Sequence, residues 1–468
     1  MATKKQNLLK INGRLSDRGI DIFVGSKKFP IVYPKDIWQK IPADVGRVLL
    51  ENIVFCETNY LPLLLNKDGA DYNFNYPLFE PVFFKNQLFD MLDCEASDGV
   101  QFLSYLKKFY NLTFRFCSLK SSLPKWPKYR RVPGIRPRAV LPFSFGKESL
   151  VSVAICLEVG IEPILVYCEE PVQPYERDCK LKLLKKIANE FKIKVHFIEH
   201  KPGLFRYGYA FNLKRPTEIG WGHQTTLLSL LTLPFVYYYQ AQYVLTGSEY
   251  QNNFTEMRNG WRVFYSIDQT EDFTAIKNNL LHLMTGGQCE VKNTLEAFDE
   301  IHIFYTLFHR YPRFAKYLFS CMAENPLYRN SHWCHRCHKC GQNFLYARAL
   351  GFDPSKVGFQ ENLLAIPGFF DNGFQHGIKV FLKQELDFPF HILAQRGDNS
   401  FYVKKFKQKI IPLLLKHNSP SPLAHSWQEC REHYTKIHPA NNLPEPYGKK
   451  ILKVLADELA SFKKIILP

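Results

Sequence analysis

The middle of the chain alternates strand-length runs with segments of helical spacing, and this alternation constrains the fold more than any other feature. Apolar or alternating runs lie at residues 139–143, 161–167, 194–198 and 243–246. Each run is short enough for a buried strand, and helical segments separate them. Neighbouring parallel strands need such crossover helices. We therefore predict an α/β fold whose parallel, doubly wound sheet lies within residues 136–290.

The regions before residue 136 and after residue 290 are predicted to form separate domains. The chain has 468 residues, enough for two or three domains. Strands are expected at 20–24 and 29–32, and helices at 37–56 and 100–106. The predicted division is an N-terminal α+β accessory domain at 1–135, a nucleotide-binding domain at 136–290, a mostly helical region at 291–395 and a C-terminal helical tail at 396–468.

Two further helices are predicted next to the fourth strand. The apolar run 225–240 is expected to form one helix before that strand, although it contains Pro234. After the sheet, Asn293, Thr294 and Glu296 resemble a capping box, which would open an aromatic-rich helix.

Composition excludes several classes of protein. Hydrophobic residues make up 46% and aromatic residues 15% of the chain, which excludes a disordered protein. No run of 18 apolar, uncharged residues appears, and Lys4 and Lys5 are not followed by an apolar segment. We therefore expect neither a membrane-spanning helix nor a secretory signal, and a cytoplasmic location.

The chain is basic, with 61 Lys and Arg against 44 Asp and Glu, a net charge of +17. This charge suits an anionic ligand such as a nucleotide, a nucleotide-linked sugar or RNA, although it also serves solubility. Basic side chains are dense at 120–138, where no acid occurs. That segment either holds a diphosphate or a nucleic-acid backbone, or forms a solvated, proline-rich linker.

The first predicted strand runs into a loop that suits a phosphate. Backbone N–H groups at the start of the following helix attract anions. Lys147 adds a cation, and Glu148 can hold Mg²⁺ against phosphate oxygens. The spacing is not that of a Walker A loop, and the alternative is an ordinary turn with a serine N-cap. The candidate nucleotide contacts here are Ser144, Phe145, Gly146, Lys147, Glu148 and Ser149.

Ligands of doubly wound sheets bind at the carboxyl ends of the strands. The loops at 168–170 and 247–249 should lie at the same edge as the first loop, which adds Tyr167 and Gly247 as nucleotide contacts. Glu249 is a second candidate for Mg²⁺, or else a helix-cap acid. His223 precedes a long apolar helix and is the candidate catalytic base; alternatively it bonds a backbone carbonyl.

A cysteine cluster indicates a metal site in the helical region. Cys334, Cys337 and Cys340 follow one another at intervals of three, and Cys321 precedes them. Four thiolates suit a structural Zn²⁺. An iron–sulfur cluster fits the spacing less well, and four unligated thiols are the remaining alternative. One of the interleaved histidines, His332, His335 or His338, is an alternative to Cys321.

The first loop resembles that of the PP-loop ATP pyrophosphatases, Ser-Gly-Gly-x-Asp-Ser. Ser144, Gly146 and Ser149 match it, whereas Phe145 stands for the first Gly and Glu148 for the Asp. The Cys-x₁₂-Cys-x₂-Cys-x₂-Cys order is similar to that of the 7-cyano-7-deazaguanine synthases. The wider order of motifs from about 139 to 395 looks most like the ATP-dependent UDP-N-acetylmuramoyl-L-alanyl-L-glutamate epimerases. The motifs are Trp221-Gly222-His223, Gly247-Ser248-Glu249, Phe319-Ser320-Cys321 and Glu361-Asn362-Leu363-Leu364.

The resemblance implies cleavage of ATP between its α and β phosphates, with a substrate carboxylate becoming adenylated. Ser144, Gly146, Lys147 and Ser149 would cradle the pyrophosphate, and Glu148 with Glu249 would hold Mg²⁺. The implied substrate is the terminal L-Glu of a UDP-muramoyl dipeptide. The alternatives are a PP-loop enzyme that modifies tRNA or a nucleobase, and a non-catalytic, zinc-stabilised nucleotide-binding protein.

Overall fold

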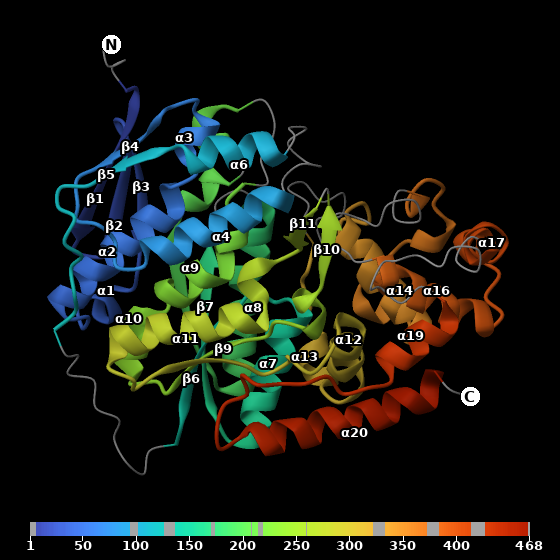
Figure 1. Cartoon of the computed structure of the whole chain (residues 1–468). Coiled ribbons are helices and arrows are strands. Elements are labelled where there is room, and N and C mark those ends of the chain that lie inside the picture. Colours follow the sequence, from blue (N-terminus) through green and yellow to red (C-terminus); the bar gives the residue numbers. More distant parts are fainter. Residues whose placement is uncertain are drawn as a thin grey trace.

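Ten strands hydrogen-bond into one sheet, in the order β12-β9-β6-β7-β8-β3-β2-β1-β4-β5. The structure is a computed structural model (Figure 1). It describes residues 6–93, 102–125, 136–169, 174–206, 208–213, 219–258, 260–321, 333–371, 383–412 and 426–466. Residues 126–135 of the basic segment, residue 170 and His332 lie outside the described residues.

Five neighbouring strands of this sheet are parallel, which confirms the predicted α/β class. Read across the sheet, β8, β7 and β6 come in reverse chain order, and β9 and β12 continue on the other side of β6. The order therefore reverses between β6 and β9, where doubly wound sheets bind ligands. The strands are β6 (Arg138–Pro142), β7 (Glu162–Glu169), β8 (Lys194–His200), β9 (Tyr243–Thr246) and β12 (Glu290–Asn293).

Helices cover both faces of the parallel strands. Alternate residues of β6 face opposite sides: Ala139 and Leu141 belong to one buried cluster, and Val140 to the other. The first cluster includes residues of α7 (Lys147–Val159) and α8 (Pro174–Phe191). The second includes residues of α9 (Gln224–Leu231), α10 (Leu233–Tyr239) and α11 (Glu271–Thr285). Burial on both faces explains the nearly continuous apolar runs of these strands.

The N-terminal region extends the same sheet. β3 pairs antiparallel with β8 through Ile31 and His200, so β1 to β5 lie at one end of the sheet (Figure 1). The strands predicted at 20–24 and 29–32 are confirmed as β2 and β3. The elements are β1 (Leu8–Ser16), β2 (Gly19–Val24), β3 (Lys27–Val32), α1 (Lys35–Trp38), α2 (Ala43–Thr58), α3 (Leu61–Leu64), β4 (Gly69–Tyr72), α4 (Glu80–Asp93), α6 (Phe102–Tyr110) and β5 (Thr113–Arg115).

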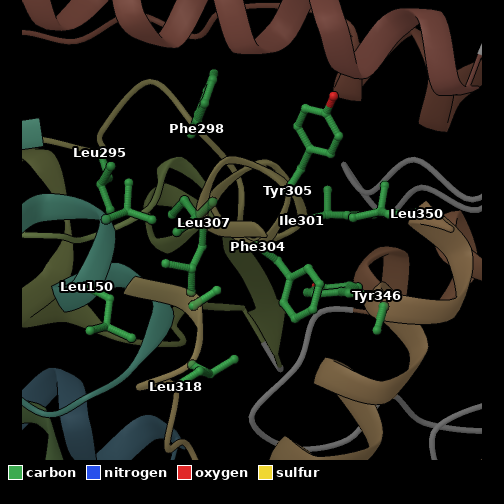
Figure 2. Packing of buried hydrophobic residues seen from close by; sticks show 14 of the residues in the cluster. Leu150, Leu295, Phe298, Ile301, Phe304, Tyr305, Leu307, Leu318, Tyr346 and Leu350 are labelled. Atoms are coloured by element: carbon green, nitrogen blue, oxygen red, sulfur yellow. The ribbon is translucent and has the colours of Figure 1, made fainter. Parts of the chain in front are cut away.

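Helices dominate the chain after β12. Figure 2 shows side chains of α12 between Leu150 of α7 and Tyr346 of α14, with the Phe304 and Tyr346 rings 5.9 Å apart. Among the described helices, none combines the length and apolar character needed to cross a bilayer. The helices are α12 (Glu300–His309), α13 (Pro312–Ala315), α14 (His338–Leu350), α16 (Lys383–Gln395), α17 (Phe401–Lys405), α19 (Trp427–Tyr434) and α20 (Gly448–Ile466).

Three helix predictions are wrong. The segment 37–56 divides into α1 and α2, with Pro42 at the N-cap of the second helix. The run 225–240 divides into α9 and α10, because Pro234 sits in the first turn of the second helix and cannot continue the first. The capping box at 293–296 does not form either. Thr294 donates its N–H to Thr246 O beside β9, and the Glu296 carboxylate binds Asn442. The helix begins instead at α12, after Asp299.

Candidate functional site

The loop between β6 and α7 has the backbone of a sharp strand-to-helix turn. Phe145, at the position of the first Gly of the PP-loop pattern, has φ 64°, a left-handed conformation that favours glycine. Its buried ring packs against Phe143 at 4.6 Å, which offsets part of this strain. The ring therefore lies in the core, whereas Ser144 is exposed.

The start of α7 is held without a side-chain cap. Gly146 is the N-cap residue, so the alternative of a serine N-cap is wrong. The Gly146 N–H donates to Ser144 Oγ at 3.2 Å, and the Ser149 hydroxyl donates to Gly146 O at 3.0 Å. The N–H groups of Lys147, Glu148 and Ser149 lie in the first turn, where a helix offers no acceptor within itself. They form the positive end of α7.

Lys147 points into the protein. It is 1% exposed, and its Nζ lies 2.5 Å from Glu148 Oε1 and 3.3 Å from Glu300 Oε2. Burial alone would lower the pKa of this lysine, but the carboxylates of Glu148, Glu300 and Glu249 outweigh burial and raise it. The ammonium group therefore offsets part of the negative charge of a partly buried carboxylate cluster.

Three carboxylates meet beside this ammonium group. Oxygens of Glu148, Glu249 and Glu300 all lie within 4.8 Å of one another, the spacing of ligands around one cation. Burial and the two neighbouring acids raise the pKa of Glu249 to about 8. For Glu300, burial is outweighed by Lys147 and Lys339, which lower its pKa. Glu249 occupies the N-cap position of a short 3₁₀ helix, as the helix-cap alternative has it, but its side chain makes no cap hydrogen bond.

Polar side chains from the C-terminal helices surround Glu300. Lys339 Nζ lies 3.5 Å from Glu300 Oε1, and Gln342 Nε2 donates to both Glu300 and Glu385. Gln251 donates to Glu385 and accepts from the Glu300 N–H at 3.0 Å. Burial is the main cause that raises the pKa of Glu385. No sequence pattern placed Glu300, Lys339, Gln342 or Glu385 at this site. Lys339 and Gln342 are close together on α14, but Glu300 lies 39 residues before Lys339 and Glu385 lies 43 residues after Gln342.

Gly247 brings the end of β9 against α7. A Cβ atom there would lie 2.8 Å from Ser152 Oγ and 3.0 Å from Glu148 O, so only glycine fits without displacement. Close by, Asn293 Nδ2 donates to Ser248 O at 2.7 Å, which joins the ends of β9 and β12. The loops after β6 and β9 therefore meet at the reversal point of the sheet.

The structure leaves two predicted site residues outside this cluster. His223 is buried against α4, where its Nδ1 lies 3.1 Å from Asn86 Nδ2 and its ring contacts Phe83. Burial lowers its pKa to about 3, so the ring is neutral at physiological pH. Tyr167 is a buried core residue near Phe197, with Lys180 Nζ 5.6 Å from its ring centre.

The four predicted cysteines converge. The sulfur atoms of Cys321, Cys334, Cys337 and Cys340 lie within 4.8 Å of one another, a geometry that can bind a metal ion such as zinc. Sγ–Sγ distances of 3.5 and 3.7 Å are close to the roughly 3.8 Å edge of a tetrahedron with 2.3 Å Zn–S bonds. Backbone N–H groups at positions 336 and 337 each donate to Cys334 Sγ at 3.3 Å.

The histidines near this cluster have different surroundings. His335, in a left-handed conformation, accepts from the Gln360 N–H through Nε2 at 2.9 Å. Cys321 can supply the fourth sulfur, because its Sγ lies within 4.8 Å of the other three.

No protein-family model matches the chain, and no curated protein matches it with statistical significance.

Proposed function

We propose that this protein is an ATP-dependent enzyme of the PP-loop type that forms AMP and pyrophosphate by adenylating a substrate. The observation that carries the proposal is the cluster of Glu148, Glu249 and Glu300 at the start of α7, where the sheet order reverses. Anionic phosphates bind at helix N-termini, and Mg²⁺ is usually bound by one or two carboxylates together with phosphate oxygens.

Each part of the site has a role in this proposal. The first-turn N–H groups of α7 and the Ser144 and Ser149 hydroxyls bind the pyrophosphate portion of ATP. Glu148 and Glu249 hold Mg²⁺, which neutralises the charge that develops on the phosphates. Lys147 pairs with Glu148 and Glu300, and its buried ammonium group helps to lower the pKa of Glu300. In this proposal Lys147 therefore does not contact a phosphate directly, whereas the sequence predicts such a contact.

The specific substrate that we propose is a UDP-linked muramoyl dipeptide, whose terminal L-Glu carboxylate would be adenylated before its α-carbon is epimerised. This choice rests on the motif order of the chain. The base is not assigned to His223, because that ring is buried against Asn86 outside the carboxylate cluster. A PP-loop enzyme that acts on tRNA is the second candidate, favoured by the net charge of +17.

ATP–pyrophosphate exchange tests the proposal. The full-length protein with Mg²⁺ should catalyse exchange that a UDP-muramoyl dipeptide stimulates and tRNA does not. Glu249→Gln should reduce exchange at least about 100-fold, since it removes a charged ligand while keeping the shape. Glu290→Gln, at the amino end of β12, is the matched control and should retain exchange. Stimulation by tRNA alone would favour the second candidate, and no exchange with either substrate would contradict the PP-loop chemistry.

A further inference from the structure

A second group of metal-ligand side chains lies on the other side of the α12 N-terminus. Asp299 is the N-cap residue of α12, His433 lies in the last turn of α19, and His438 lies in the loop that follows. The ligand atoms of these three side chains are all within 4.8 Å of one another. Asp299 Oδ2 lies 3.1 Å from His433 Nε2 and 3.0 Å from His438 Nε2.

Within this group, two buried polar atoms have no hydrogen-bond partner among the described residues. They are Oδ1 of Asp299 and Nε2 of His433, which is near Oδ2 of Asp299 but not aligned for a hydrogen bond. Buried polar atoms are rarely left unsatisfied. Ligand atoms about 3.0 Å apart are expected where two bonds of about 2.1 Å meet at a right angle on a metal.

The surrounding contacts hold the two rings in place. The Tyr250 ring stacks on the His438 ring, with 3.8 Å between ring centres and an interplanar angle of 4°. The backbone N–H of His438 donates to Ala297 O at 3.2 Å. His302 is also near Asp299, but both of its ring nitrogens are used by the backbone. Its Nδ1 accepts from the Asp299 N–H at 3.3 Å, and its Nε2 donates to Tyr434 O at 2.7 Å.

We propose that Asp299, His433 and His438 bind a divalent transition-metal ion through one carboxylate oxygen and two Nε2 atoms. Two imidazoles and one carboxylate are typical of open sites for Zn²⁺ or Fe²⁺, in contrast to the closed Cys₄ set. The site is separate from the carboxylate cluster, because Asp299 and Glu300 are adjacent residues that face different partners. A metal ion bound at this site would link α19 and the loop after it to the start of α12, the helix that carries Glu300.

Cobalt binding to the full-length protein, freed of metal, tests this proposal. Co²⁺ bound by thiolates shows intense sulfur-to-metal absorption, whereas Co²⁺ bound by imidazole and carboxylate shows only weak visible bands. With Mg²⁺ in excess to fill the carboxylate cluster, we expect a second equivalent of Co²⁺ that binds without added thiolate absorption. This measurement needs no variant, and binding of the thiolate-linked equivalent alone would overturn the proposal.

A pair of variants locates the second equivalent. Asp299→Asn keeps an N-cap residue for α12 but removes the charged ligand, so it should lose this equivalent and keep the thiolate absorption. His309→Gln is the matched control, because this histidine is on the same helix but binds Glu458 at 2.8 Å, and it should keep both equivalents. An Asp299→Asn protein that still binds both would overturn the proposal and show that Asp299 only pairs with the two histidines.

Discussion

At the scale of single residues, burial decides which groups a charged side chain contacts. Lys147 stands where a flexible cation for phosphate is expected, yet its side chain lies between Glu148 and Glu300. An isolated carboxylate cluster would be costly to bury, and the ammonium group reduces that cost. The negative charge that Lys147 does not offset raises the pKa of Glu249, together with burial.

Glu249 should make stability depend on pH. Its ordinary pKa is 4.5 and its pKa in the folded protein is about 8, so folding favours the protonated form. Its contribution to stability is therefore complete below about pH 4.5 and is lost as the pH rises through about 8. The free energy of unfolding of the native protein, measured with urea, should fall between pH 5 and 8 relative to that of Glu249→Gln.

Two controls belong to this measurement. Glu432→Gln, at an exposed position, should follow the native pH dependence. Mg²⁺ should reduce the loss of stability at pH 8, because it binds the deprotonated carboxylate. Parallel pH curves for the native protein and Glu249→Gln would contradict the raised pKa.

At the scale of elements, the site depends on two strand ends that approach one helix. β6 is followed by the loop that opens α7, and β9 ends at Thr246, where the next residue, Gly247, lies so close to α7 that a Cβ atom would meet Ser152 Oγ and Glu148 O. This contact sets how far Glu249 lies from Glu148. A small displacement of the β9 loop would therefore separate the two proposed Mg²⁺ ligands.

Gly247→Ala should disturb this contact. The added methyl group would overlap Ser152 Oγ and Glu148 O, and overpacking of this kind typically costs about 1–3 kcal/mol of unfolding free energy. Gly46→Ala is the matched control, because that position in α2 has only an ordinary contact, at 3.7 Å, and alanine favours helices by roughly 1 kcal/mol. Urea unfolding should show a loss for the first and no loss for the second; equal stability would argue against tight packing.

At the scale of the whole molecule, the C-terminal helices complete a site that begins on the sheet. α14 starts within the cysteine cluster and carries both Lys339 and Gln342, which contact Glu300. Glu385 on α16 joins the same network. A metal ion held by the four cysteines would thus fix the start of α14 against the carboxylate cluster.

Loss of that metal ion should affect both stability and activity. Cys337→Ser should lower bound zinc by one equivalent and lower the thermal midpoint, because metal binding contributes to folding. It should also reduce pyrophosphate exchange, since α14 positions Lys339 and Gln342. Cys117→Ser, an exposed cysteine outside the cluster, should change none of these. Metal analysis together with calorimetry measures the first two effects, and unchanged zinc content in Cys337→Ser would rule out this ligand.

Local patterns in the sequence determined the parallel strands, the loop at 144–149 and the cysteine set. Strand runs and helical spacing depend on nearby residues, and three of the four cysteines are only three residues apart. Predictions from local patterns were wrong where a side chain binds a residue that is distant in the sequence. Glu296, read as a helix-capping residue, binds Asn442 instead, 146 residues away.

The strand pattern placed Glu148 and Glu249 at one edge of the sheet, but only the tertiary structure decided which other charges meet them. Glu300 and Glu385 come from two further helices, and no spacing in the chain relates them to this pair. The same holds for Asp299 with His433 and His438. Backbone periodicity is set by hydrogen bonds and burial within short segments, whereas the chemistry of these two clusters depends on how packing brings the segments together.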